Sequence, residues 1–275
     1  MILLKPLLPK IKCNVWPKVK MTPSALAQKL KPFSDNPLLE ARWILSEVSD
    51  EKKIQSVLKR RQKGEPLSKI LGHKGFWKGD FITSKDVLDP RADSETLIEA
   101  VLKTLPDKSD PYSFVDIGTG SGCLLISLLM EYKNAKGTGI DLSEKALKIA
   151  RKNAKKNGVK AKFIKKDMKN INNRFDFGVS NPPYIPTKDI KKLDNNVQLY
   201  DPIMALNGGS DGLDYYRALC QIQSIPLLFL EIGKGQKTGI CHIFKNAGWH
   251  LVSTHKDLGK IIRVLVFQKK TCKRQ

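Results

Sequence analysis

Short apolar runs and helical repeats alternate along the chain from Tyr112 onward. The apolar runs predict strands at Tyr112–Ile117, Gly137–Ile140, Lys162–Ile164, Phe175–Val179, Leu227–Ile232, Trp249–Ser253 and Ile261–Phe267. Apolar positions three or four residues apart predict helices between them, at Cys123–Tyr132, Ser143–Asn157, Leu213–Gln223 and Gln236–Ala247. Strands that alternate with helices are typical of a doubly wound α/β sheet with helices on both faces, so we expect that fold class.

The pattern before this region is different and divides the chain into four parts. Residues 1–20 contain five lysines, three prolines and no acid, which predicts a loosely ordered basic tail. Residues 21–65 have the spacing of two or three short helices and are expected to form a small helical domain. Glycines among aromatic residues predict a β-hairpin linker at 66–92. Residues 93–275 form the main domain, and Asp93–Glu95 is predicted to cap its first helix.

Composition and charge narrow the class of protein. With 41% hydrophobic and 28% charged residues, the chain is typical of a globular protein large enough for one α/β domain and a small appended domain. The formal net charge of +22 has two interpretations that both stay open. In the first, the charge reflects a lysine-biased composition, because the lysines are spread along the chain. In the second, it forms a basic face that contacts a polyanion such as RNA or the ribosome.

Cysteine usage and apolar run lengths argue against a disulfide framework, a zinc site and a membrane span. The five cysteines are odd in number and scattered, and they form no CxxC pair. Free thiols are typical of a reducing compartment. The longest apolar runs, such as Ile225–Leu230, are far shorter than the ~20 residues that cross a bilayer. We therefore expect a cytoplasmic protein with no membrane partner and no metal.

A glycine-rich turn follows the strand that ends at Ile117 and precedes a helix. Glycines permit a tight turn and a close approach of the backbone to a ligand. The GxGxG spacing lacks the final offset of a dinucleotide-binding loop and the Lys-Ser/Thr of a phosphate-binding loop. It fits a cofactor without phosphate, such as S-adenosylmethionine, although alone it is equally consistent with a structural turn. The candidate cofactor-binding residues in this turn are Gly118, Thr119, Gly120, Ser121 and Gly122.

Two acids follow the next two strands and extend the candidate cofactor site. Asp141 stands at the end of its strand, about 20 residues beyond the glycines, where an acid accepts hydrogen bonds from ribose hydroxyls. A cap for the following helix is a compatible second role. Asp167 and Met168 follow the third strand and are candidates for contacts to adenine. Taken alone, Asp167 is more typical of an acid in a surface loop.

The most specific motif is Asn181-Pro182-Pro183-Tyr184, directly after the fourth strand. Two consecutive prolines donate no backbone hydrogen bond and hold φ near roughly −65°, so the chain leaves the sheet as a rigid edge with free carbonyls. The Asn181 side-chain oxygen and the Pro182 carbonyl can both accept from one NH2 group, and Tyr184 offers a ring face to a planar group. We predict catalytic roles for Asn181, Pro182 and Tyr184, with Pro183 added for substrate binding and Asn181 also near the cofactor.

These motifs resemble those of the HemK/PrmC family of release factor glutamine methyltransferases. The resemblance covers roughly residues 22–268 and includes segments Leu71–Trp77, Asp89–Glu95, Tyr200–Leu213 and Leu230–Gly233. The chain departs from the family at Ala92, where the family has proline, and near Gly259–Arg263. The resemblance implies a seven-stranded class I S-adenosylmethionine-dependent methyltransferase sheet, a helical N-terminal domain that helps to bind the substrate, and a β-hairpin linker.

The resemblance also implies the reaction. The expected substrate is the glutamine side-chain amide in the Gly-Gly-Gln loop of a peptide chain release factor. Two alternatives stay open: an adenine-amino methyltransferase acting on DNA or RNA, which also handles a planar NH2 group, and a glutamine methyltransferase of a ribosomal protein. A non-catalytic, RNA-associated scaffold is disfavoured by the Asn181–Tyr184 motif. No general base is evident, so positioning is expected to contribute much of the catalysis.

Overall fold

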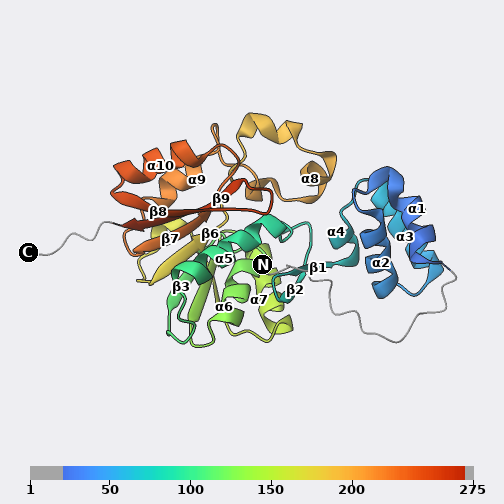
Figure 1. Cartoon of the computed structure of the whole chain (residues 1–275), viewed down its shortest axis with the longest axis horizontal. Coiled ribbons are helices and arrows are strands. Elements are labelled where there is room, and N and C mark those ends of the chain that lie inside the picture. The colour runs from blue at the N-terminus through green and yellow to red at the C-terminus, as the bar shows by residue number, and fades with distance from the viewer. Residues whose placement is uncertain (1–20, 270–275) are drawn as a thin grey trace, which may run out of the picture.

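A seven-stranded mixed sheet forms the centre of the computed structural model, which describes residues 21–269 (Figure 1). The tail expected at residues 1–20 lies outside the described residues. The sheet order is β5-β4-β3-β6-β7-β9-β8. Its strands are β3 (Ser113–Ile117), β4 (Lys136–Asp141), β5 (Lys162–Lys165), β6 (Phe177–Ser180), β7 (Leu227–Glu231), β8 (Trp249–Lys256) and β9 (Ile262–Lys269).

The first five strands in sequence run parallel, whereas β9 runs antiparallel to both of its neighbours, β7 and β8. The order reverses between β3 and β6, which is where open α/β sheets form a crevice at the carboxyl ends of their strands. This topology confirms the predicted doubly wound sheet of seven strands.

Helices cover both faces of the sheet, and successive side chains of one strand point to opposite faces. Phe114 of β3 packs with the helices on one side, whereas Val115 packs with those on the other. Val266 and Leu265 of β9 divide in the same way. Because both faces are buried, these strands read as continuous apolar runs. The first side carries α5 (Glu95–Thr104), α6 (Cys123–Glu131) and α7 (Glu144–Lys156), and the second carries α9 (Asp214–Leu219) and α10 (Lys237–Asn246) (Figure 1).

A separate cluster of helices precedes the sheet and has its own small core. Its apolar residues include Leu26, Ile44 and Leu58, all at or below 5% exposure. Leu67 is buried in the same cluster, so the helical part continues beyond residue 65 into the segment expected to be hairpin. The helices are α1 (Pro23–Leu30), α2 (Pro37–Glu47), α3 (Glu51–Gln62) and α4 (Leu67–Leu71). The hairpin itself is shorter, with β1 (His73–Phe76) and β2 (Gly79–Ile82).

Two local predictions need correction. Ser94 has helical backbone angles (φ −71°, ψ −15°) and its hydroxyl makes no capping hydrogen bond to α5. A single 3-10 turn at Ala92–Ser94 leads into the helix instead, which frees this hydroxyl for a tertiary contact. The helix predicted at Leu213–Gln223 ends early, at Leu219. The carbonyl of the next residue, Cys220, accepts from Trp249 Nε1 at 2.9 Å, which accompanies the early end of the helix.

Sequence patterns did not predict the short helical segments between β6 and α9, because they lack an apolar stripe. The main one is α8 (Asn195–Tyr200). Within residues 21–269, no helix is long and apolar enough to cross a membrane.

Candidate active site

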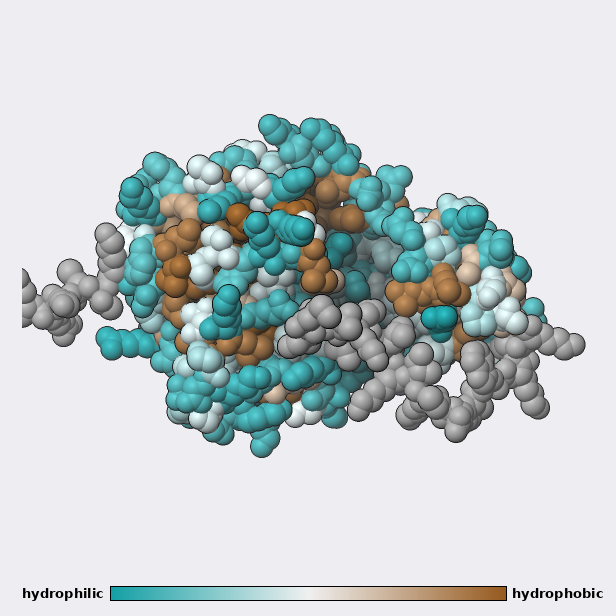
Figure 2. Space-filling view, viewed as in Figure 1, coloured by the Kyte–Doolittle hydropathy of each residue, from teal (hydrophilic) through white to brown (hydrophobic). Residues whose placement is uncertain are grey.

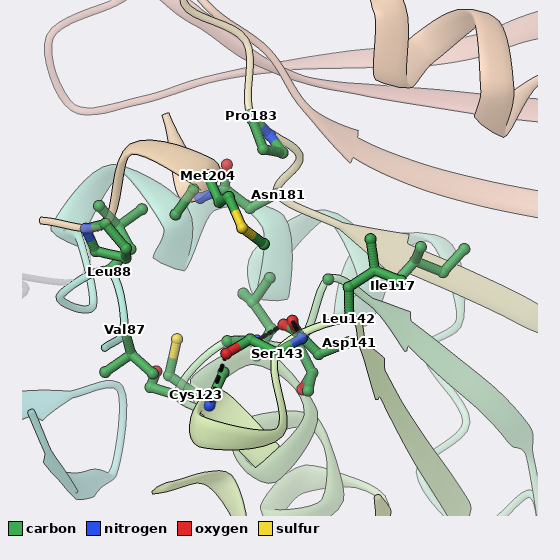
Figure 3. Close-up of a pocket in the computed structure, with 18 of the residues that line it drawn as sticks. Val87, Leu88, Ile117, Cys123, Asp141, Leu142, Ser143, Asn181, Pro183 and Met204 are labelled. Carbon is green, nitrogen blue, oxygen red and sulfur yellow. Dashed lines mark hydrogen bonds between the residues drawn. The ribbon is translucent and has the colours of Figure 1, made fainter. Parts of the chain in front are cut away.

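A cavity of about 260 Å3 opens at the carboxyl ends of the parallel strands. Residues from the ends of β3, β4 and β6 line it, together with segments before α5 and after α8. Figure 3 shows Asn181, Pro183 and Met204 on one side of the cavity and Asp141 and Ser143 on the other. Of the residues predicted from the sequence, the cavity brings together Gly118, Thr119, Gly120, Ser121, Asp141, Asp167, Met168, Asn181 and Pro183.

The glycine turn has the tight, positive-φ backbone that glycine permits. Gly118, Gly120 and Gly122 have φ values of 73°, 54° and 80°, a region that other residues rarely adopt. The Gly118 amide donates to the Ile140 carbonyl at 2.9 Å, which ties this turn to the end of β4. This backbone hydrogen bond therefore fixes the start of the loop at the strand ends.

Asp116 anchors the turn from its buried side. Its carboxylate accepts a hydrogen bond from the Thr119 hydroxyl at 2.7 Å and is only 1% exposed. Burial raises the pKa of Asp116 to about 7. Its role is thus to hold the turn from the interior.

Asp141 lies at the rim of the cavity and organises two neighbouring segments. One carboxylate oxygen accepts from the Gly120 amide at 2.9 Å, and the other accepts from the Ser143 amide at 2.8 Å. Ser143 in turn caps α7 by accepting from the Ala146 amide. A carboxylate offers about four acceptor positions, so both oxygens of Asp141 retain capacity for a ligand.

Asp167 and Met168 lie in the loop after β5 and line the cavity. The Asp167 carboxylate accepts from the Lys169 amide at 2.9 Å, as in a turn. The structure therefore places this acid at the cavity without excluding the turn role that the sequence left open. Apolar contacts come from Ile117 and Leu142, which line the same cavity.

Asn181 projects into the cavity wall from the end of β6, and its amide is held by the protein. Its Nδ2 donates to the Ser94 hydroxyl at 3.1 Å. The Ser94 hydroxyl, which makes no capping hydrogen bond to α5, therefore accepts a hydrogen bond from Asn181, 87 residues away in the chain. This contact leaves the Oδ1 oxygen of Asn181 as the group available to a ligand.

Three predicted residues lie outside the cavity wall. Gly122 begins α6 where that helix approaches α7, and an added Cβ there would lie 3.2 Å from Ala150. Pro182 is buried behind the loop. The Tyr184 ring packs into the core on the side of α9 and α10, and burial raises the pKa of its hydroxyl. The backbone carbonyl of Tyr184 accepts from Gln236 at 2.9 Å, which fixes this part of the chain.

Two wall segments were not assigned to the site from the sequence, although both were noted as family-like. The cavity is lined by residues 85–91 and by Pro202, Met204 and Ala205. An ion pair of 2.9 Å between Arg91 and Asp201 joins the two segments. The buried Lys69 of α4 lies 2.7 Å from Asp89 and 3.3 Å from Asp201. This network connects the helical cluster to both wall segments, so loss of one partner would leave buried charges uncompensated.

Asn153 of α7 is a further residue that the sequence did not reveal. It is fully buried, and its amide donates to the Ser121 carbonyl of the glycine turn at 2.8 Å. Its oxygen accepts from the Ile82 amide of β2 at 2.6 Å. The side chain thus joins the hairpin to the glycine turn. No periodicity distinguishes it from other polar residues of α7.

A search of residues 21–269 for three or more histidine, cysteine, aspartate or glutamate side chains placed to hold a metal ion finds no such group.

Comparisons with known proteins agree with this geometry. A family model described as the methyltransferase small domain matches residues 82–197. The chain is 35% identical over 263 residues to a release factor glutamine methyltransferase of Agrobacterium fabrum, covering 85% of this chain and 91% of that protein. A protein of the same name from Rhodospirillum rubrum is 40% identical over 225 residues, covering 79% and 69%. Among solved structures, a methyltransferase from Pyrococcus furiosus has a TM-score of 0.51 at 17% identity, covering 78% and 97%, which is a likeness of fold.

Proposed function

The chain belongs to the family of release factor glutamine methyltransferases, and from this premise we propose that it methylates the glutamine side-chain amide in the Gly-Gly-Gln loop of a peptide chain release factor. The observation that carries the proposal is the Asn181 amide, which lines the cavity and is held through Nδ2 by Ser94.

S-adenosylmethionine is the methyl donor of this enzyme family, and the cavity residues fit it. The backbone turn of positive φ carries no phosphate-binding side chains, as a cofactor without phosphate requires. Asp141 would hold the ribose, Asp167 and Met168 the adenine, and Ile117 and Leu142 would exclude water from the ring. When bound, the cofactor supplies a strongly electrophilic methyl group.

The chain contributes orientation of the acceptor amide. A glutamine amide nitrogen is a weak nucleophile because its lone pair is delocalised into the carbonyl. Asn181 Oδ1 would accept one N–H of the substrate amide. We propose that the Pro182 carbonyl accepts the other, although Pro182 itself does not line the cavity. These two hydrogen bonds fix the nitrogen toward the methyl donor, and such positioning lowers the barrier by removing the entropy cost of alignment. A role for the Tyr184 ring stays a prediction, since this ring packs against the core.

A protein substrate requires a docking surface near the cavity mouth. Leu199, Ile203 and Met204 are 69%, 59% and 63% exposed, and Met204 also lines the cavity. Figure 2 shows apolar side chains near α8, beside a hollow in the surface. We propose that the segments flanking the target glutamine contact these side chains. The expected cytoplasmic location, and proximity to the ribosome or RNA, remain predictions from the free thiols and the net charge.

The test is methyl transfer from labelled S-adenosylmethionine to four purified substrates: a release factor, the same factor with its Gly-Gly-Gln glutamine changed to alanine, ribosomal protein, and DNA or RNA. We expect label only in the unmodified release factor, with mass spectrometry locating one methyl group on that glutamine. Label in nucleic acid or ribosomal protein, with none in the release factor, would replace this function by one of the two alternatives.

The docking surface can be tested separately. Ile203→Glu should raise KM for the release factor while cofactor affinity stays unchanged, because Ile203 is 59% exposed and does not line the cavity. Val252→Glu is the matched control, because Val252 is also an exposed apolar residue (45%) but lies on the edge strand β8. Equal effects of the two variants on KM would argue against docking at Ile203.

A further inference from the structure

A buried carboxylate lies behind the cavity wall and is not explained by the functions assigned so far. Glu231 is the last residue of β7 and is 2% exposed. Its Oε2 atom is buried and has no hydrogen-bond partner within residues 21–269. Arg263, whose charge acts on Glu231, forms its ion pairs with Asp93 at 3.0 Å and with Asp257 at 2.7 Å instead. Glu231 thus remains a buried acid without a salt bridge.

Among the described residues, a hydrogen bond from Ser94, which also contacts Asn181, acts on this carboxylate and lowers its pKa. Ser94 is 2% exposed and its hydroxyl is hydrogen-bonded to Glu231. The same oxygen accepts from Asn181 Nδ2 at 3.1 Å. The three side chains therefore form a chain of hydrogen bonds that starts in the core, at the end of β7, and ends at the cavity.

The direction of these hydrogen bonds decides what Asn181 offers to a ligand. A serine hydroxyl has one proton and can act as donor or acceptor. An ionised carboxylate only accepts, so it takes the Ser94 proton and leaves the Ser94 oxygen as an acceptor. That oxygen then selects the NH2 end of the Asn181 amide. If Ser94 donated toward Asn181 instead, the amide would turn by half a rotation and present NH2 to the cavity.

We propose that Glu231 and Ser94 are positioning residues that hold the Asn181 amide with its Oδ1 oxygen facing the acceptor nitrogen of the substrate. This inference rests on the proposed function. It assigns to Ser94 and Glu231 the role of determining which end of the Asn181 amide faces the substrate.

The stability cost of Glu231 supports a functional reason for its presence. A buried carboxyl group without an ion pair destabilises a fold, and apolar residues of similar size are commonly tolerated at such positions. Neighbouring residues of β7, such as Leu228 and Leu230, are fully buried and apolar, so leucine is compatible with this strand. A purely structural position would not require an acid here.

The ionisation of Glu231 gives the proposal a pH signature. Burial raises the pKa of this carboxyl group to about 7, although the hydrogen bond from Ser94 lowers it. Below that pH the protonated acid no longer fixes the direction of the Ser94 hydroxyl, so turnover should fall. The charged and titratable groups that act on Glu231 or contact it are Arg263, Asp93, Arg91, Tyr184, Tyr216 and Cys123.

Single-turnover methylation of a purified release factor, measured from pH 6 to 8.5 with S-adenosylmethionine affinity measured alongside, tests the proposal. Ser94→Ala and Glu231→Leu should lower the rate roughly 10- to 100-fold, the scale of a small misplacement of a reacting group, with cofactor affinity unchanged. Glu231→Gln can still accept from Ser94, so it should keep most of the rate at pH 8. It should lose the wild-type decline near pH 7.

Two matched variants control for the loss of a buried hydroxyl and of a buried charge. Ser127→Ala removes a fully buried hydroxyl from α6, and Glu131→Gln removes a buried carboxylate at the far end of the same helix. Both should leave the rate and its pH profile unchanged. Wild-type rates in Ser94→Ala and in Glu231→Leu, or an unchanged pH decline in Glu231→Gln, would overturn the proposal.

A readout that needs no substrate separates this inference from the proposed function. In protein labelled with 15N-asparagine, the Asn181 side-chain NH2 signal is identified by its loss in Asn181→Ala. Its protons should exchange slowly in the wild type and at least several-fold faster in Ser94→Ala and Glu231→Leu. If the wild type methylates no release factor but this difference is found, the proposed function fails while the hydrogen-bond chain stands. Equal exchange rates in all proteins would refute the chain itself.

Discussion

Replacing Asn153 by alanine tests whether the hairpin and the glycine turn are joined by one side chain. The substitution removes three hydrogen bonds: from the Ile82 amide at 2.6 Å, to the Ser121 carbonyl at 2.8 Å and to the Ile82 carbonyl at 3.2 Å. Each is worth about 1 kcal/mol net, and an orphaned buried donor costs roughly 1–3 kcal/mol. We therefore expect a loss of about 2–5 kcal/mol in the free energy of unfolding.

Thermal and urea denaturation measure this loss. At about 2–4 °C per kcal/mol for a protein of this size, Tm should fall by roughly 5–15 °C. Because the Ser121 carbonyl loses its anchor, S-adenosylmethionine affinity measured by calorimetry at a temperature where the variant is folded should also fall, by about 5-fold or more.

Asn157→Ala is the matched control one turn along the same helix. Asn157 holds the hairpin through the Asp80 amide at 3.1 Å and the Asp80 carbonyl at 3.0 Å, but it does not contact the glycine turn. It should lower Tm and leave cofactor affinity unchanged. An unchanged Tm in Asn153→Ala, or an equal loss of cofactor affinity in both variants, would refute the assigned coupling.

Three further predictions concern the site. Asn181→Ala should lower single-turnover methylation by about 10²–10³-fold with cofactor affinity retained; Asn181→Asp should be as slow, because it lacks the NH2 group that donates to Ser94 at 3.1 Å. Asp141→Ala should weaken S-adenosylmethionine binding by roughly 2–4 kcal/mol in calorimetry, because it removes charge-assisted hydrogen bonds and releases the Gly120 amide. Burial raises the pKa of Glu231 to about 7, above the ~4.3 of an unfolded glutamate, so the native state binds more protons between these pH values and its stability should fall as pH rises. Urea denaturation across pH 4.5–7 should show a shallower fall in Glu231→Gln, and an equal slope in both proteins would contradict this assignment.

The sequence predicted the fold well because the fold depends on local repeats. Each strand and the helix after it carry their own apolar period, and a strand that alternates with helices has few ways to pack. Phe114 and Val115 show the limit of this argument. Both read as apolar, but only the assembled sheet shows that they pack with helices on opposite faces.

The sequence also located those parts of the site that are continuous in the chain. The glycine turn from Gly118 and the motif at Asn181 each act through backbone geometry that a few adjacent residues determine, and both line the cavity. The same local logic was wrong for Ser94, which has the residue type of a helix cap but contacts Asn181 instead. A serine hydroxyl hydrogen-bonds to whichever partner tertiary packing brings near, and no local sequence pattern indicates which partner that is.

Only the tertiary structure decided the contacts between distant segments. The Arg91–Asp201 pair spans 110 residues, and the Asn153–Ile82 contact spans 71. Ser94 meets Glu231 because α5 packs on the strand β7, whose last residue is that acid. Such pairs leave no period in the sequence, since each depends on how the connections cross the sheet edge rather than on the residues beside it. The chain by itself therefore specified the sheet and its binding loops, whereas packing determined which side chains hold those loops in place.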